Sequence, residues 1–349
     1  MLTTRTAKAH AGGVLLLSLM AGCAATERAP VSFSYVVEAE RGLPQGMKTI
    51  AIMPAKVGPT TDPKWSDMCV TVMQTMANES RRLGADITVS DRRDTQVTFD
   101  EADLAAAGMS TAPGGSGGQL LAVQGVILSH IDVKVEKHIG KQRTLAGLSL
   151  SGWGGRGWGG GGTDIRTKEV ETVSRTMTVQ TAFKLVDTAN NMIWEHYSPR
   201  PYTGTDKTKA SPIFGSSQTE AELTPQDEII ATLVGRAVQE FISRLMPCRI
   251  DVDTVVLSSG NKSCIEGVKM LRAEMYDEAV AMFKAALANN PDDHRAAYGA
   301  GVACEASGRH PEALRFYKRA CAGADIAMYR EALDRAKLYG HRVRPGTGS

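Results

Sequence analysis

Alternating apolar and polar positions predict strands in the first two thirds of the chain. In 126–138 the apolar residues at every second position fall on one face of an extended strand and polar residues fall on the other. A second alternation covers 173–187, turn-forming residues fill 187–191, and an apolar run resumes at 192–197. Shorter apolar runs at 48–55 and 86–90 precede them. The pattern predicts a sheet with long antiparallel strands.

Apolar residues at helical spacing predict helices between and after these strands. The segment 65–83 has this spacing and ends at Gly84. Thr224 and Pro225 are suited to cap and start a helix whose apolar face continues to Pro247. Thr98, with glutamate three residues later, predicts a short helix through 107. We expect loops at 109–118 and at 198–222, which are rich in glycine or polar residues.

The C-terminal part holds two copies of one pattern, 34 residues apart. The first copy contains Gly267, Tyr276, Ala279, Phe283, Ala286 and Pro291, and the second contains Gly301, Gly308, Ala313, Tyr317 and Ala320. Small residues allow antiparallel helices to approach closely, and the aromatic rings fill the space to the next helix. The segment resembles the tetratricopeptide repeat family. That resemblance implies an all-α array of helical hairpins that binds proteins and carries out no chemistry, with 327–338 as a capping helix.

By this resemblance, the first helix of each repeat lines an inner groove for a partner. The groove positions are Cys264, Val268, Leu271, Arg272, Arg295, Tyr298, Val302 and Glu305. Of these we expect Arg272, Arg295, Tyr298, Val302 and Glu305 to contact a protein or peptide. The alternative is that this face packs on the first domain, because two repeats are fewer than the roughly three that such arrays need.

The order of elements before the repeats resembles the periplasmic domain of curli-secretion lipoproteins. The resemblance rests on Ala51-Ile52-Met53-Pro54, Gln124-Gly125-Val126-Ile127, Phe183-Lys184-Leu185-Val186-Asp187 and Ile193-Trp194. It covers roughly 45–246 and implies an α/β, sandwich-like domain. The expected fold class is therefore α+β, with this domain followed by the helical array.

The N-terminus has the pattern of an export signal. Arg5 and Lys8 precede a short apolar run, and Met20-Ala21-Gly22-Cys23 resembles a bacterial lipobox. The resemblance implies lipidation (palmitate) at Cys23 and a membrane anchor. Ala24 follows the cysteine, which by resemblance to enterobacterial lipoproteins favours the periplasmic face of the outer membrane. A plain secretory signal is the alternative.

Composition adds little to the functional prediction. The formal net charge is +2, so no nucleic acid partner is expected. We find no catalytic set, metal framework or cofactor motif, and we expect a non-enzymatic protein. Cysteines that follow the leader can form disulfides in an exported protein, and we expect a bridge between Cys248 and Cys264 at the junction of the domains.

These observations predict the domain organisation. We expect a signal peptide at 1–22, a tether at 23–44, the α/β domain at 45–247, a linker at 248–259, the repeats with their capping helix at 260–338, and a tail at 339–349. Within the linker, 249–257 is either a short strand or an irregular connection. The α/β domain is expected to lie near the membrane.

Two functions are compatible with this organisation. The first is a lipid-anchored periplasmic adaptor or scaffold that binds protein partners in envelope assembly. The alternative is a subunit of an oligomeric outer-membrane secretion channel, implied by the curli-secretion resemblance. The two differ at 145–163, which carries Trp153, Trp158 and many glycines between the long strands. We expect this segment to be an exposed hairpin tip that does not cross the membrane, because its glycines weaken strand pairing and Arg156 lies near its centre.

Overall fold

A computed structural model describes residues 27–90, 123–149, 164–188, 192–208 and 223–344. The chain divides into two compact units. The sheet unit comprises 40–246, and the helical unit combines 1–39 with 247–349. The predicted signal peptide, Cys23, the predicted helix at 98–107 and most of the tip at 145–163 lie outside the described residues.

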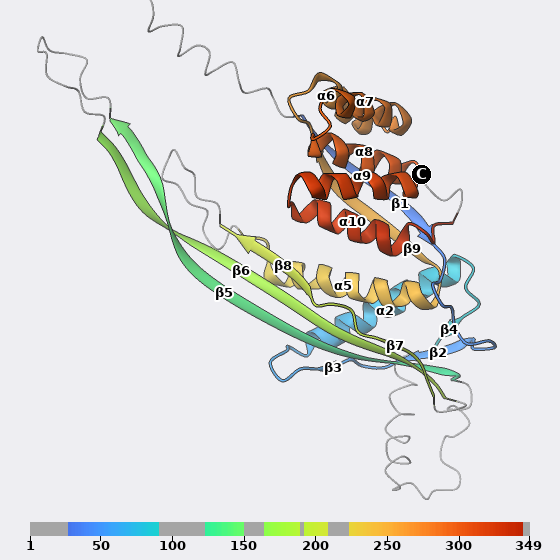
Figure 1. Cartoon of the computed structure of the whole chain (residues 1–349). Helices are drawn as coiled ribbons and strands as arrows, with labels where there is room; N and C mark the ends of the chain where they lie inside the picture. Colours follow the sequence, from blue (N-terminus) through green and yellow to red (C-terminus); the bar gives the residue numbers. More distant parts are fainter. Residues whose placement is uncertain (1–26, 91–122, 150–163, 189–191, 209–222, 345–349) are drawn as a thin grey trace, which may run out of the picture. The chain divides into compact units, whose positions relative to one another are not determined.

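The sheet unit contains a seven-stranded sheet in the order β4-β2-β5-β6-β7, with β3 paired to β5 and β8 to β6. Its strands are β2 (Thr49–Ile52), β3 (Lys56–Val57), β4 (Thr88–Val89), β5 (Gly125–Ser149), β6 (Asp164–Asp187), β7 (Met192–Tyr197) and β8 (Tyr202–Lys207). The helices α2 (Lys64–Arg82) and α5 (Gln226–Leu245) pack on one face of this sheet (Figure 1). The core lies between that face and the helices, where the Phe183 and Phe241 rings stack with centroids 4.8 Å apart.

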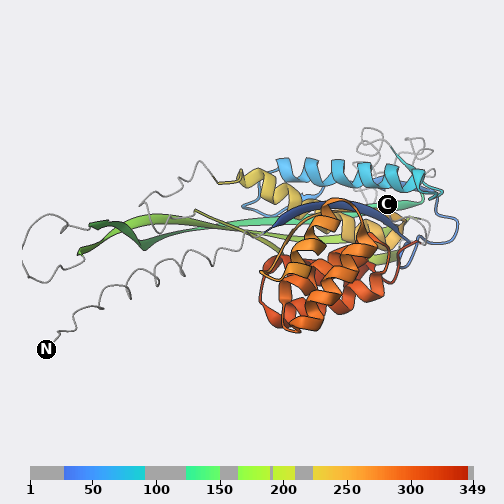
Figure 2. The same ribbon diagram turned by 90° about the horizontal axis from the view of Figure 1, so that it is seen from above.

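The predicted antiparallel pair of long strands is confirmed. Both strands extend beyond the segments of apolar alternation from which they were predicted. β5 and β6 pair from Gly125 opposite Asp187 to Ser149 opposite Asp164. Figures 1 and 2 show the two strands continuing beyond the neighbouring strands. No helix of the described residues covers the outer part, so Ile139 is 67% exposed and the apolar alternation fades there. Pairing thus continues where the sequence shows no buried face.

The expectation of a loop at 198–222 is wrong for its first half. β8 (Tyr202–Lys207) pairs antiparallel with Ser174–Val179 of β6. Four of its six residues are polar, and none is fully buried. A strand at the edge of a sheet obtains its backbone hydrogen bonds from one neighbour without needing an apolar face, so apolar alternation did not reveal it.

The helical unit begins with a strand from the N-terminal part of the chain. β1 (Arg28–Val37) pairs antiparallel with β9 (Cys248–Leu257) along the full length of both strands. The helices follow: α6 (Lys262–Arg272), α7 (Tyr276–Asn289), α8 (His294–Ala306), α9 (His310–Gly323) and α10 (Ala327–Tyr339). The fold class expected from the sequence, an α/β domain followed by an array of helical hairpins, is confirmed.

The predicted tether is therefore wrong for 28–37, which forms β1, and of the two expectations for 249–257, a short strand or a linker, the strand is observed. Every second residue of β1 is buried, and these are Ala29, Val31, Phe33, Tyr35 and Val37. They join the apolar core of the helices together with alternate residues of β9. The alternation in 28–37 is a strand signal whose partner lies more than 200 residues away, and nothing local shows that partner.

Close approach of the helices explains the small residues of the repeat pattern. A Cβ atom on Gly299 would lie 2.5 Å from the Phe283 ring, and one on Gly301 would lie 2.5 Å from the Tyr317 ring. Gly267 is almost as close to Phe283. The two aromatic rings thus occupy the space that glycine leaves on the facing helix, as the repeat pattern predicted.

Candidate protein-binding site

The predicted inner groove is filled by the chain's own strand pair. The first helices of the hairpins, α6 and α8, contact β1 and β9 respectively. Tyr298 is 2% exposed, Val302 0% and Glu305 1%. These three positions were expected to contact a partner, and that prediction is wrong. The alternative, in which this face packs on the first domain, does not describe the face either, because the covering strands β1 and β9 lie outside 45–247.

Glu305 on α8 fixes β1 to the helices through a buried polar cluster. Its carboxylate accepts hydrogen bonds from the Tyr35 hydroxyl at 2.9 Å and the Tyr317 hydroxyl at 2.5 Å. Arg335 on α10 donates two more, at 2.8 and 2.7 Å. Burial alone raises the pKa of Glu305, but the Arg335 guanidinium and the two hydroxyl donors outweigh it and hold the pKa below its usual value. The carboxylate is therefore charged and fully compensated.

His310 completes the surroundings of Tyr35. The His310 and Tyr35 rings meet edge to face with centroids 4.8 Å apart. The Nε2 atom of His310 is buried without a hydrogen-bond partner. Burial lowers the pKa of His310, and the nearby Glu305 and Arg335 charges act in opposite directions. A neutral imidazole is therefore part of the contact that holds β1.

The two arginines expected in the groove also bind the strand pair. Arg272 donates to the carboxylate of Glu27 at 3.2 Å and to the backbone carbonyl of Arg28. Arg295 donates to the backbone carbonyl of Ser258 at 3.0 Å. These contacts satisfy acceptors at the start of β1 and just after β9. The predicted residues are thus gathered on one face, but they serve the fold.

The expected disulfide is absent. Cys248 and Cys264 are both free thiols. Cys248 begins β9, whereas Cys264 lies on α6 beyond the other end of that strand and accepts a hydrogen bond from the Ser259 amide at 3.3 Å. A ten-residue strand spans about 30 Å, and a disulfide requires Cα atoms within about 7 Å.

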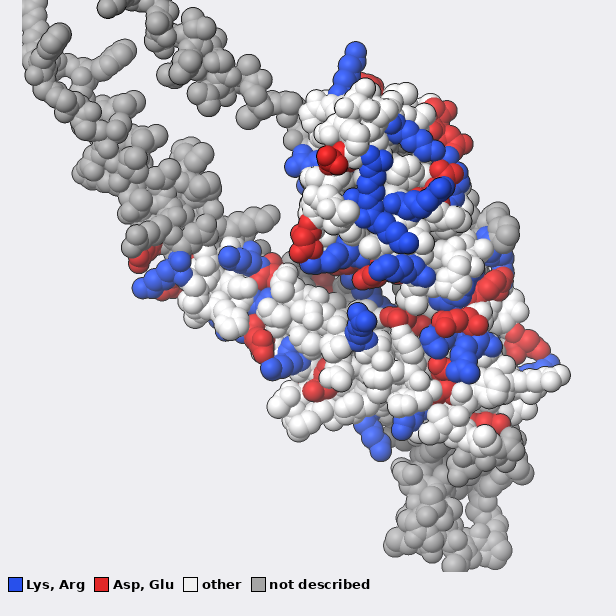
Figure 3. All heavy atoms as spheres, viewed as in Figure 1, with Lys and Arg blue, Asp and Glu red and all other residues white. Residues whose placement is uncertain are grey.

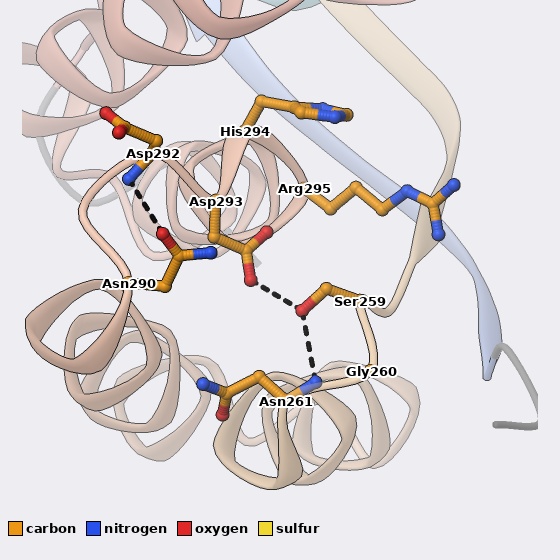
Figure 4. Close-up of a pocket in the computed structure, with 8 residues that line it drawn as sticks. All are labelled: Ser259, Gly260, Asn261, Asn290, Asp292, Asp293, His294 and Arg295. Atoms are coloured by element: carbon orange, nitrogen blue, oxygen red, sulfur yellow. Dashed lines mark hydrogen bonds between the residues drawn. The ribbon is translucent and has the colours of Figure 1, made fainter. Parts of the chain in front are cut away.

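Two clefts lie at the turn between α7 and α8. The larger, of about 370 Å³, is shown in Figure 4. Its lining is Ser259, Gly260, Asn261, Asn290, Asp292, Asp293, His294 and Arg295. The second, of about 230 Å³, is lined by Pro291, Asp292, His294, Arg319, Ala322 and Gly323. The two clefts share Asp292 and His294, so together they flank one turn of the array.

Internal hydrogen bonds position the polar side chains of the larger cleft. Asp293 caps α8 by accepting from the Ala296 amide at 3.0 Å, and its other oxygen accepts from the Ser259 hydroxyl at 2.5 Å. Asn261 caps α6 by accepting from the Ser263 amide at 2.8 Å. These bonds hold Ser259 and Asp293 together, as Figure 4 shows. Asp292 is exposed beside them.

Sequence reasoning missed these clefts. Asn290-Pro291-Asp292-Asp293 carries the signals of a turn followed by a helix cap. Those signals place the turn, but they do not show that 259–261 lies opposite it. That juxtaposition depends on the pairing of β9 with β1, which no local signal shows.

The glycine and aromatic contacts described above are the packing of a known repeat. Residues 271–330 match the tetratricopeptide repeat family. The tetratricopeptide match covers the segment from the end of α6 to the start of α10, including both aromatic–glycine contacts at α8. Tetratricopeptide repeats generally mediate binding between proteins, so this segment indicates a protein-interaction scaffold.

Comparison with solved structures gives remote similarities, among them the following two. One is a homologue of neuraminyllactose-binding hemagglutinin from Helicobacter pylori, with 10% identity, a TM-score of 0.28, and coverage of 58% of this chain and 85% of the other. The second is lipoprotein GNA1162 from Neisseria meningitidis, with 14% identity, a TM-score of 0.23, and coverage of 56% of this chain and 98% of the other. No curated protein matches the chain.

Two further features of the described residues bear on the site. They contain no group of His, Cys, Asp and Glu side chains that could hold a metal ion. None of their helices has the length and apolar character needed to cross a membrane.

Proposed function

We propose that this protein is a lipid-anchored scaffold of the bacterial cell envelope that binds protein or peptide partners through its tetratricopeptide unit. Lipidation at Cys23 attaches it to the periplasmic face of the outer membrane. It acts by binding alone, without catalysis or a cofactor. The observation that carries the proposal is the helical array itself, whose family match and internal packing are those of an interaction module.

The proposed partner surface is the α7–α8 turn. The concave face packs against β1 and β9, so a partner has no access to Tyr298, Val302 and Glu305. The two clefts offer hydrogen-bond donors and acceptors that are already held in position. Asp292 lies in both clefts and is itself exposed, which makes it the central contact.

The polar lining indicates the chemistry of the partner. Carboxylate, amide and imidazole groups predominate in the larger cleft, and Arg319 contributes to the smaller one. Such a surface suits an extended, polar peptide segment that exchanges hydrogen bonds with it. It does not suit an apolar helix, which would leave these polar groups desolvated and unpaired.

Site-specific photo-crosslinking tests the proposal. A photoreactive residue at Asp292 should give a discrete adduct with one envelope protein, whereas the same residue at Glu331, exposed on α10, should not. The purified partner should then bind the Asp292→Arg variant at least tenfold more weakly than the matched Glu331→Arg control. Equal affinity of the two variants would exclude the turn as the binding surface.

A further inference from the structure

The start of β1 lies close to the proposed lipid anchor along the chain. Only four peptide links separate Cys23 from Glu27, and such a segment spans at most about 14 Å. Glu27 is already held in the helical unit, because its amide donates to the Ser258 hydroxyl at 2.8 Å. The next residue, Arg28, is paired with Leu257. A lipid on Cys23 therefore restrains this end of the helical unit.

Helix α6 lies across the same end of the strand pair. Arg272 at the end of α6 donates to the Arg28 carbonyl. Cys264, near its start, accepts from the Ser259 amide just beyond β9. Figure 1 shows α6 and α7 beside the first residues of β1. The first repeat thus lies at the end of β1 to which the anchor is joined.

The opposite end of β1 lies beside the residues that follow α10. Val37 pairs with Val343, and the Glu38 amide donates to the Arg342 carbonyl at 2.8 Å. A strand of this length separates the two ends by about 30 Å. The first repeat and the end of α10 are therefore at different distances from the anchor.

The side chains at the anchored end favour an anionic surface. Arg28 and Lys262 are exposed, and neither has an ion-pair partner among the described residues. Lys269 and Arg272 add positive charge, although each is paired with a glutamate. Figure 3 shows Lys and Arg side chains gathered with acidic ones over the helical unit. Exposed cations within a Debye length of a bilayer are attracted to anionic lipid headgroups.

We propose that the end of the helical unit formed by the start of β1 and by α6 faces the bilayer and contacts its phospholipid headgroups. This inference rests on the lipid anchor of the proposed function. It replaces the expectation that the α/β domain is the part held at the membrane, because the residues next to the anchor belong to the helical unit.

Quenching by labelled lipids tests the orientation. The full-length lipidated chain, with Cys321→Ala to remove the half-buried thiol, carries one fluorophore at Lys262→Cys or at Lys337→Cys on α10. It is reconstituted in phosphatidylethanolamine–phosphatidylglycerol vesicles with a headgroup-attached quencher. We expect at least threefold stronger quenching at 262 than at 337. Equal quenching, or stronger quenching at 337, would overturn the orientation while leaving the anchor intact.

Two variants separate the anchor from the orientation. Cys23→Ser should leave the chain in solution; if the native chain also fails to sediment with vesicles, both the anchor and this inference are wrong. After insertion of about twenty Gly and Ser residues between Ala25 and Thr26, quenching should still be stronger at 262 than at 337, because the headgroup contact of α6 does not depend on the short tether. Equal quenching at the two sites after insertion would assign the orientation to the tether alone and overturn the headgroup contact.

Discussion

The Tyr35 hydroxyl on β1 donates a hydrogen bond to the Glu305 carboxylate on α8 at 2.9 Å, across 270 positions of sequence. This contact joins the first strand of the chain to the centre of the helical repeats. It accounts for the burial of the face that such repeats usually present to a partner.

Tyr35→Phe tests this contact energetically. The substitution keeps the ring against His310 but removes one donor to a buried charge, so the unfolding free energy of the helical unit should fall by about 1.5–3 kcal/mol. Urea denaturation followed by amide exchange in 28–37 measures it. Ser34→Ala, on the opposite side of the same strand, should change stability by less than about 0.5 kcal/mol. A Tyr35→Phe chain as stable as the parent would show that the bond contributes nothing.

Acidification should loosen the same contact. The pKa of His310 is lowered by burial in the folded chain, so unfolded chains bind the proton first as pH falls below about 6.5. The contribution of neutral His310 to the unfolding free energy is fully present above that pH and is lost as the pH falls below it. The lowered pKa of Glu305 causes a further loss of stability below about pH 4.5. Denaturation midpoints at pH 7.5 and 5.5 measure the first effect. In the His310→Phe variant the denaturation midpoint should change less between pH 7.5 and 5.5. An unchanged difference would show that other groups cause the loss of stability.

The glycines that face aromatic rings should be intolerant of a methyl group. Gly301→Ala forces the Tyr317 ring to move and should cost about 1–3 kcal/mol. Gly235→Ala on α5 is the matched control, because no atom lies within 4 Å of its added Cβ. That control should be neutral or stabilising by up to about 1 kcal/mol. Thermal denaturation of both variants measures the difference. Equal destabilisation of the two variants would show that the loss does not come from the contact with Tyr317.

The five described cysteines should behave as free thiols, with reactivity that depends on their burial, and should form no disulfide. Burial raises the pKa of Cys69 to about 12 and that of Cys304 to about 11, so both react slowly in the folded chain. Cys321 is the least buried of the five described cysteines and should be alkylated first at pH 8. Peptide mapping without reductant measures this order. A peptide linking Cys248 to Cys264 would contradict the structure.

Replacement of the hairpin tip distinguishes a scaffold from an oligomeric channel subunit. β5 and β6 are already paired at Ser149 and Asp164, so a short Gly-Ser linker in place of 150–163 can close the hairpin. The variant should keep its fold and remain a monomer, as should the parent, in light scattering. A detergent-stable ring formed by the parent and lost in the variant would support the channel reading.

Local patterns in the sequence predicted the elements with clear apolar periodicity. On the predicted apolar face, Ile127, Ile131 and Val133 are buried, whereas Val135 is 39% exposed. The helices α2 and α5 and the helical hairpins are confirmed. These patterns are visible because each element buries its own apolar face. The glycine–aromatic spacing predicted the repeats because their helix contacts are local in sequence.

The candidate site could not be predicted, because it depends on pairing over long sequence separation. Val31 and Phe33 alternate with polar residues, but the partner strand β9 lies on the far side of the sheet unit in the sequence. Without that pairing, Tyr298 and Glu305 resemble open groove residues. The clefts at Asp292 were missed for the same reason, since Ser259 reaches Asp293 only when β9 is in place.

The central claim is that β1 and β9 occupy the concave face of the repeats and leave partners to bind elsewhere. Hydrogen–deuterium exchange of the 28–37 peptide, with and without the crosslinked partner, tests it most directly. We expect the Phe33 and Tyr35 amides to exchange as slowly as those of α8 in both states, while protection on partner binding appears at 290–294. Rapid exchange in 28–37, or partner-induced exposure of that strand, would show that the groove opens to partners and that β1 does not block it.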